Sequence, residues 1–152
     1  MSEGIKVVAR NKKAFHEYHI EDTYQAGLVL LGSEIKSIRA GRVNLRDGYA
    51  QDRDGELWLM NVHITPYEQA DQWGHEDPMR PRKLLLHRRE IDRIITHIRE
   101  RGYTAVPTRL YLERGLAKVD IAIAKGKKKH DKRATMAKRD AERDIRRALK
   151  NR

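Results

Sequence analysis

The chain has 152 residues, and its 33 Lys and Arg against 22 Asp and Glu give a formal net charge of +11 at pH 7. This length fits one domain, and no apolar run reaches the roughly 18 to 20 residues that a membrane span requires. The N-terminus lacks the apolar stretch of a signal peptide, and the absence of cysteine excludes disulfides, thiolate catalysis and thiolate metal sites. We therefore expect an unexported, cytoplasmic protein that does not enter a membrane.

The positive charge is concentrated at the C-terminal end. Residues 125–152 hold 13 Lys and Arg against 4 Asp and Glu, a net charge of +9, whereas residues 1–124 carry only +2. This division predicts two parts, a nearly neutral body over 1–124 and a basic tail over 125–152.

The first elements of the body are predicted as follows. Residues 1–10 form a loosely held arm, and the β-branched and aromatic residues of 15–31 indicate one long strand, or two, bent at Gly27, because an interior glycine often marks a bulge or corner. Residues 33–40 indicate a short helix with Ser33 as its N-cap and an acidic residue in its first turn.

Two hairpins follow from their turn residues. Asp-Gly at 54–55 joins strands over 49–53 and 56–64, because both positions tolerate the positive φ of a type I′ turn. Arg-Gly at 114–115 joins strands over 108–113 and 116–124 in the same way.

The segment between the hairpins contains a loop and a helix. Residues 66–82 contain three of the four prolines and indicate a long exposed loop, of a kind that is often functional or mobile. The spacing of Ile91, Ile94, Ile95 and Ile98 predicts an amphipathic helix with a basic outer face.

These elements predict a mainly β fold. Hairpin connections favour a small closed antiparallel barrel of the OB-like kind, with two to three short helices, over a sandwich or a parallel α/β fold. The tail contains a thin stripe that is mostly alanine, so it should be disordered alone and helical when an anionic partner neutralises it.

No catalytic, metal or cofactor site is predicted. His16 and His19 are an odd number of residues apart in a stretch predicted as a strand, which places them on opposite faces. The sequence has no glycine loop for phosphate and no Gly-x-Ser-x-Gly elbow. We expect a protein that is not an enzyme.

Nucleic acid is the partner that the composition favours. A charge run is often only a solvated face or a targeting signal, but the cations of the tail continue to Arg152 on an inducible helix, which suits a channel lined by phosphates. If about six of them contact phosphate, log K should fall with log[salt] at a slope of about −4 to −5.

Several long motifs resemble one family. They are Asn11 to Tyr18, Ala26-Gly27-Leu28, Gly32 to Gly41, Asn44 to Asp47, Arg82 to His87 and Gly126 to Arg133. In these motifs, which span most of the chain, the sequence resembles small protein B, the bacterial partner of transfer-messenger RNA.

The resemblance implies an OB-like barrel without catalytic residues and a role in ribosome rescue by trans-translation. The body would hold the tRNA-like domain of the RNA, and the tail would enter the empty mRNA channel and decoding centre of a stalled ribosome as a helix. The implied partners are transfer-messenger RNA, the small-subunit rRNA and, indirectly through the RNA, elongation factor Tu, with the protein itself a monomer.

The resemblance also implies site residues. On the body, the expected RNA-binding residues are Lys12, Lys13, Glu34, Lys36, Arg39, Lys83, Leu85 and Lys118. In the tail, the residues expected at the decoding centre and mRNA channel are Lys127, Lys128, Lys129, His130, Asp131, Lys132 and Arg133.

Several alternatives stay open. Glu34 can instead support the first turn of its helix, and Leu85 can belong to the core. Gln25 stands where the family usually has glutamate, so the role of that position is open. At the level of function, a structural ribosomal protein would also carry a basic tail threaded through rRNA, whereas a nuclease has little support.

Overall fold

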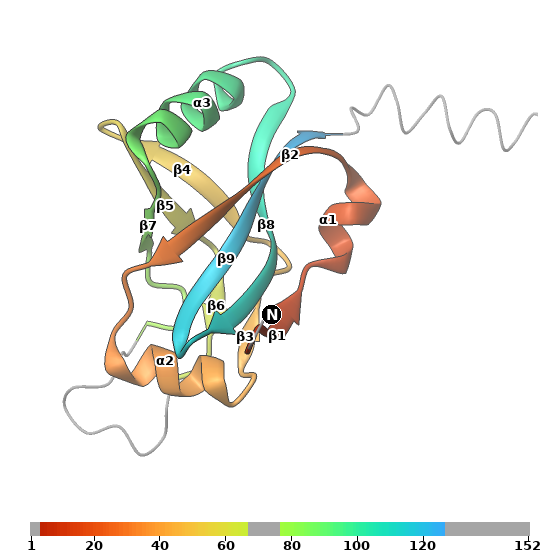
Figure 1. Ribbon diagram of the computed structural model, residues 1–152. Helices are drawn as coiled ribbons and strands as arrows, with labels where there is room; N and C mark the ends of the chain where they lie inside the picture. Colours follow the sequence, from red (N-terminus) through yellow and green to blue (C-terminus); the bar gives the residue numbers. More distant parts are fainter. Residues whose placement is uncertain (1–3, 67–76, 127–152) are drawn as a thin grey trace, which may run out of the picture.

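The computed structural model describes residues 4–66 and 77–126, which contain nine strands and three helices (Figure 1). In chain order they are β1 (Lys6–Arg10), α1 (Lys12–Glu17), β2 (Tyr18–Leu28), α2 (Gly32–Arg39), β3 (Val43–Asn44), β4 (Tyr49–Arg53), β5 (Glu56–Met60), β6 (His63–Ile64), β7 (Arg82–Leu85), α3 (Arg88–Ile98), β8 (Tyr103–Glu113) and β9 (Leu116–Gly126). The prediction of a mainly β fold with short helices is confirmed.

Seven strands form one antiparallel sheet in the order β1-β8-β9-β2-β7-β5-β4, and β3 pairs with β6 separately. The long strand β2 joins the two halves of this sheet. It pairs with β9 from Tyr18 to Gly27 and then with β7 at Gly27 and Leu28. Gly27 therefore lies where the chain passes from one half of the sheet to the other.

The prediction of a closed barrel is not confirmed, because the two edge strands, β1 and β4, do not pair with each other among the described residues. β4 lies close to β8 without joining its ladder. Next to β1, two backbone carbonyls of β8 accept hydrogen bonds from Asn11. Its backbone N–H donates to Thr108 at 2.8 Å, and its side-chain amide donates to Pro107 at 2.9 Å. Strand β1 and the start of α1 thus occupy the edge that closure by β4 would need.

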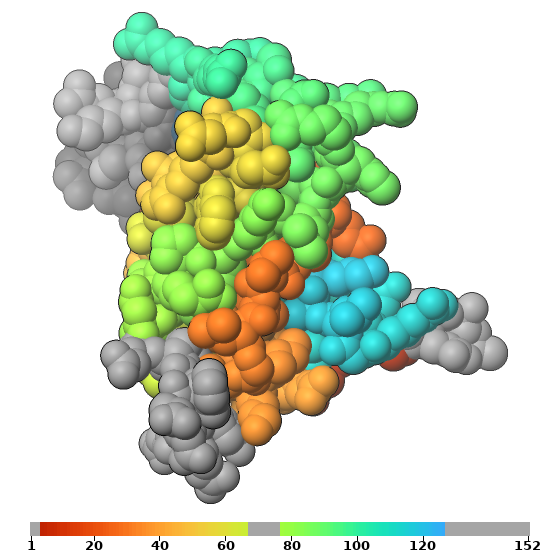
Figure 2. All heavy atoms as spheres, turned by 90° about the vertical axis from the view of Figure 1, so that its left-hand side faces the viewer, coloured from red at the N-terminus to blue at the C-terminus, as the bar shows by residue number. Residues whose placement is uncertain are grey.

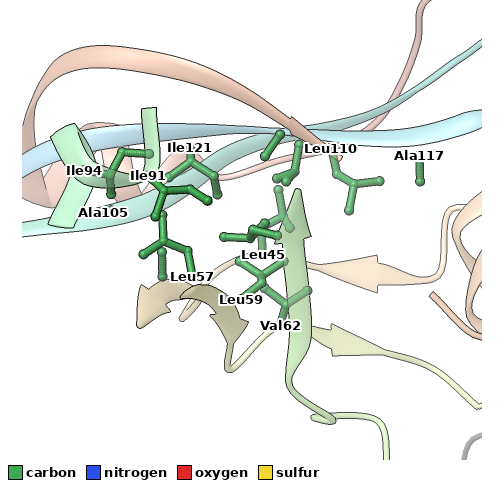
Figure 3. Close-up of a cluster of buried hydrophobic side chains, with 14 of the residues drawn as sticks. Leu45, Leu57, Leu59, Val62, Ile91, Ile94, Ala105, Leu110, Ala117 and Ile121 are labelled. Carbon is green, nitrogen blue, oxygen red and sulfur yellow. The ribbon is translucent and has the colours of Figure 1, made fainter. Parts of the chain in front are cut away.

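The core lies between the two halves of the sheet, with α3 at one end and α2 at the other (Figure 1). Figure 3 shows Ile91 and Ile94 of α3 beside Leu57 and Leu59 of β5 and Ile121 of β9. All five side chains are buried. The predicted isoleucine face of α3 is therefore the face that packs on the sheet.

Both predicted hairpins are present. Asp54 and Gly55 have φ of 52° and 81°, and Arg114 and Gly115 have φ of 53° and 78°, as the left-handed positions of these turns require. β5 lies between β4 and β7, so its register is fixed from both sides.

Several boundaries were predicted wrongly. Residues 6–10 are not a loose arm but strand β1, paired with β8. Residues 15–17 belong to α1, because the Asn11 side chain accepts a hydrogen bond from the N–H of Ala14 at 3.0 Å and starts a helix there. The predicted strand over 56–64 breaks at Asn61, whose φ is 57°. The N-cap of α2 is Leu31 rather than the predicted serine.

Candidate nucleic-acid interface

Strand β7 presents two of the predicted RNA-binding residues on its outer side. Side chains alternate across a strand, so Arg82 and Leu84 point into the core while Lys83 and Leu85 point out. Leu85 is 51% exposed, although a leucine in a central strand is ordinarily buried. It is therefore not a core residue, and the alternative that placed it in the core was wrong.

Lys118 lies next to Leu85 across one glycine. Gly27 is the strand partner of both Leu85 in β7 and Lys118 in β9. A Cβ added at Gly27 would lie 3.4 Å from the Cβ of Leu85, so the missing side chain leaves the surface open between the two residues. In Figure 2 the three strands run side by side on one face, β7 in green, β2 in orange and β9 in blue.

A shallow furrow of about 310 Å³ follows this opening. Its apolar lining includes Leu85, Leu116 and Ile35, with Lys118 beside them. Leu116 is 63% exposed, so the furrow combines accessible apolar surface with a cation. Such a combination suits a nucleic-acid strand, in which bases offer apolar faces and phosphates offer charge.

Helix α2 borders the furrow and adds two further predicted residues. Ile35 lines the furrow, and Lys36 and Arg39 are exposed on the same helix. We name the surface formed by Lys36, Arg39, Lys83, Leu85 and Lys118 the β7–β9 face. The structure thus brings five of the eight predicted body residues onto two strands and the helix that borders them.

Glu34 is different, because its side chain is fully buried beneath α2. Its carboxylate accepts hydrogen bonds from Arg80 and from Arg82, the latter with Nε at 2.6 Å from Oε2, and from the N–H of Leu31 at 2.8 Å. Burial alone would raise the pKa of Glu34, but the hydrogen bonds from Arg80 and Leu31 and the charge of Arg82 together hold this pKa below its usual value. The position fits the alternative of first-turn support and leaves no exposed surface for RNA.

Lys12 and Lys13 lie away from the β7–β9 face, on α1. Lys12 is exposed, and Lys13 Nζ lies 2.8 Å from Oδ1 of Asp47. The hydrogen bond between them raises the pKa of Lys13 and lowers the pKa of Asp47. Both members of the pair line a separate hollow of about 290 Å³ between α1 and β4.

Sequence reasoning missed a polar network on the outer side of β2, β9 and β8. Tyr111 donates to Oδ1 of Asp120 at 3.0 Å and accepts from the Gln25 amide at 2.5 Å. Arg109 donates from Nε to Oδ2 of Asp120 at 2.6 Å, and its guanidinium lies 4.6 Å from the centre of the Tyr111 ring. Burial raises the pKa of Tyr111, and the hydrogen bond to Asp120 raises that of Arg109.

The sequence did contain a signal for this network. Side chains alternate along each strand of the second hairpin, which places residues 109, 111 and 113 of one strand and 118 and 120 of the other on the same face. The Gln25 amide also lies 3.3 Å from Oε2 of Glu113, which Lys118 approaches at 3.8 Å. The network therefore reaches the β7–β9 face through Lys118.

Helix α3 carries a second group of cations that the site prediction did not use. Arg89 and Arg93 are exposed on its outer side and line a hollow of about 310 Å³ together with His97. The sequence signal was the predicted basic outer face of this helix.

The seven predicted residues of the tail, 127–133, lie outside the described residues. Within 4–66 and 77–126, no cluster of three or more His, Cys, Asp or Glu could hold a metal ion. Over the same ranges, none of the helices has the length and apolar character to cross a bilayer.

A mainly antiparallel sheet with exposed cations around an apolar furrow defines a class of protein, the small β domains with the surface of a nucleic-acid-binding module. The family model described as SmpB protein matches residues 8–151. The chain belongs to this family.

Similar proteins agree over nearly the full length. The SsrA-binding protein of Geobacillus kaustophilus (strain HTA426) is 58% identical over 97% of this chain and 94% of the relative, and that of Roseiflexus sp. (strain RS-1) is 60% identical over 97% and 93%. A chain in the solved structure "tmRNA-SmpB: a journey to the center of the bacterial ribosome" is 42% identical, covers 85% of this chain and 94% of its own, and has a TM-score of 0.69.

Proposed function

We propose that this chain is an RNA-binding adaptor that holds the tRNA-like domain of transfer-messenger RNA and delivers it to stalled ribosomes for trans-translation. The observation that carries this proposal is the agreement over nearly the whole chain with SsrA-binding proteins and with the SmpB chain of the tmRNA complex. The adaptor has no chemical step of its own, acts in the cytoplasm as a monomer, and meets elongation factor Tu only through the RNA.

The β7–β9 face supports binding of the RNA by the body. Lys83 and Lys118 offer positive charge to phosphates, and Leu85 offers an exposed apolar contact to a base or sugar. Phosphate contacts position a nucleic acid, while apolar and base-edge contacts select a structure. Because residues 1–124 carry a net charge of only +2, we propose that the body recognises a local RNA shape rather than attracting any polyanion.

The basic tail is proposed to supply the ribosomal contact. Residues 125–152 carry +9, enough to follow the phosphates of an mRNA channel that has lost its message. Within this segment, His130 is proposed to contact a decoding-centre base, and Asp131 to cap the start of a helix, where a carboxylate is favourable.

One truncation tests the division of labour. A chain ended after Lys125 should bind the tRNA-like RNA with an affinity close to that of the full chain, because the β7–β9 face is intact. It should not support peptide tagging on ribosomes stalled at the end of a message. Loss of most RNA affinity in the truncated chain would contradict the proposal.

Sequencing of the RNA that copurifies with the full chain provides a second test. The expected result is one dominant small RNA with a tRNA-like end, together with substoichiometric association with ribosomes. Cosedimentation with small subunits at one copy each, without such an RNA, would instead indicate a structural ribosomal protein.

A further inference from the structure

Helix α3 presents a row of three residues that the β7–β9 face does not include. Arg89, Arg93 and His97 follow one another at intervals of four, so they lie along one side of the helix. The opposite side holds the buried Ile91 and Ile94. We call Arg89, Arg93 and His97 the α3 row.

The two arginines of this row differ from the neighbouring arginines of α3, which form ion pairs with carboxylates. Arg88 is paired with Glu56 at 3.4 Å and with Asp92 at 3.0 Å, and Arg99 is paired with Asp52 at 3.2 Å. Within the described part of the chain, Arg89 and Arg93 form no ion pair. Asp92 borders the same hollow, but Arg88 already holds its carboxylate. Two guanidinium groups are therefore available on one side of α3.

The row continues into the last described residues of the body. The ring of His97 meets the ring of Tyr103 edge to face, with 6.2 Å between their centres, and Nζ of Lys125 lies 6.0 Å from the centre of the same Tyr103 ring. The N–H of Gly126 donates to the carbonyl of Gly102 at 2.9 Å, which fixes the end of β9 beside the end of α3. The cations of residues 127–152 follow directly in the sequence.

This arrangement separates the α3 row from the residues proposed to hold the tRNA-like RNA. In Figure 1, α3 and the end of β9 lie at one end of the molecule and α2 at the other. In Figure 2, green side chains of the α3 region stand out at the top, above the orange and blue strands of the β7–β9 face. The last described residues before the tail, Lys125 and Gly126, therefore lie on the α3 side of the molecule.

We infer that the α3 row binds phosphates of ribosomal RNA next to those that the tail binds, and so extends the ribosomal contact onto the body. This inference rests on the proposed function. Four helical residues rise about 6 Å, which suits guanidinium groups placed on successive phosphates, and the planar guanidinium is the side chain best suited to phosphate. RNA is favoured over an acidic protein because the strongly basic sequence of 127–152 begins directly after Gly126, which lies beside the end of α3.

The test uses the full-length chain with Arg89→Gln and Arg93→Gln together. Both side chains are exposed and glutamine is a good helix former, so the fold should be retained, which circular dichroism and thermal unfolding can check. The matched control is Lys6→Gln with Arg114→Gln, which removes the same charge from two exposed positions. Lys6 lies at the start of β1 and Arg114 in the turn between β8 and β9.

Binding is measured to the tRNA-like RNA and to small ribosomal subunits without mRNA, at several salt concentrations. The α3 variant should bind the subunits about tenfold more weakly, with the slope of log K against log[salt] reduced in magnitude by about 1.5 to 2, because two phosphate contacts are lost. Its affinity for the tRNA-like RNA should stay equal to that of the control.

Three results would overturn the inference. Subunit binding equal to that of the control would show that the row makes no ribosomal contact. An equal loss toward the tRNA-like RNA would assign the row to that RNA. Weaker subunit binding with an unchanged salt slope would indicate an acidic ribosomal protein. If instead the unaltered chain fails to bind the tRNA-like RNA, it is the proposed function that fails.

Discussion

Arg82 donates a hydrogen bond from Nε to Oε2 of Glu34 at 2.6 Å, and both side chains are fully buried. The same guanidinium donates to the carbonyls of Val62 and Pro78. One ion pair thus fastens α2 to β7 and to the segments on either side of the 67–76 region. Since α2 and β7 carry four of the five residues of the β7–β9 face, Glu34 positions that face while its own side chain stays buried.

Removal of the Glu34 carboxylate should therefore destabilise the body strongly. Glu34→Ala leaves the charge of Arg82 buried without its partner, a change that typically costs about 3 to 5 kcal/mol. Urea unfolding should show this loss. Glu90→Ala is the matched control, because Glu90 occupies the same capping position in α3 but, among the described residues, accepts a hydrogen bond only from the N–H of His87, at 3.2 Å. It should cost about 1 kcal/mol, and equal losses would contradict the positioning role.

The same ion pair predicts an acid-sensitive fold. The pKa of Glu34 is lower in the folded chain than its ordinary value, so the folded state binds fewer protons than the unfolded state at this group. The contribution to stability is complete above the ordinary glutamate pKa, about 4.3, and is lost as pH falls through the lower folded pKa. In Glu34→Gln this part of the pH dependence should be absent, which urea unfolding between neutral and acid pH can measure.

The sequence predicts those parts of the fold that local chemistry determines. The hairpins follow from residues at positive φ, such as Gly55 and Gly115, and the buried side of α3 follows from the spacing of its isoleucines. The strand at residues 6–10 cannot be predicted from local chemistry, because its pairing with β8 joins segments about a hundred residues apart. The open edge of the sheet likewise depends on long-range hydrogen bonds from Asn11 to Pro107 and Thr108.

The candidate site shows the same limit. The alternation in β7 places Lys83 and Leu85 on one side, but only the pairing of Gly27 with two strands brings Lys118 beside them. Nor does the sequence show that the carboxylate of Glu34 turns inward, because its arginine partners are more than forty positions away. A motif identifies which residues matter, whereas packing decides which of them face a ligand.

Leu85 and Leu84 form a natural pair for separating RNA binding from folding. Leu85→Ala should leave stability within about 0.5 kcal/mol, because the side chain is mostly exposed, and should weaken binding to the tRNA-like RNA. Leu84→Ala empties a core position that is 1% exposed and should cost about 2 to 5 kcal/mol. Urea unfolding and RNA titration on both variants provide the check. Unchanged RNA affinity in Leu85→Ala would remove this residue from the proposed interface.

Two glycines should respond oppositely to alanine. A Cβ at Gly48 would lie 2.7 Å from side-chain atoms of both Pro107 and Val62, so Gly48→Ala should destabilise by about 1 to 3 kcal/mol. A Cβ at Gly32 meets no atom of the described residues within 4 Å, and alanine there should gain up to about 1 kcal/mol, because it restricts the unfolded chain and suits the start of α2. Thermal unfolding distinguishes the two. A neutral Gly48→Ala would mean that β4 and β8 can move apart easily.

Gln25→Glu should weaken the polar network of Gln25, Tyr111 and Glu113. The amide donates both to the Tyr111 hydroxyl and toward Glu113, and a carboxylate can donate to neither. It would instead place a negative charge beside Glu113 and directly opposite Asp120, its strand partner in β9, and directly opposed like charges on a sheet are destabilising, here by about 0.5 to 1 kcal/mol at neutral pH.

The compensating change tests this explanation. Gln25→Glu combined with Glu113→Gln exchanges the charge and the amide, so a double-mutant cycle by urea unfolding should recover the part of the loss that is due to Glu113. Gln25→Ala is the control for the simple absence of the amide. If Gln25→Glu lowers the free energy of unfolding no more than Gln25→Ala does, and adding Glu113→Gln does not change the stability of the Gln25→Glu variant, charge repulsion is not the cause. Recovery would show that glutamine at this position depends on the Glu113 carboxylate, which the Gln25 amide approaches from β2.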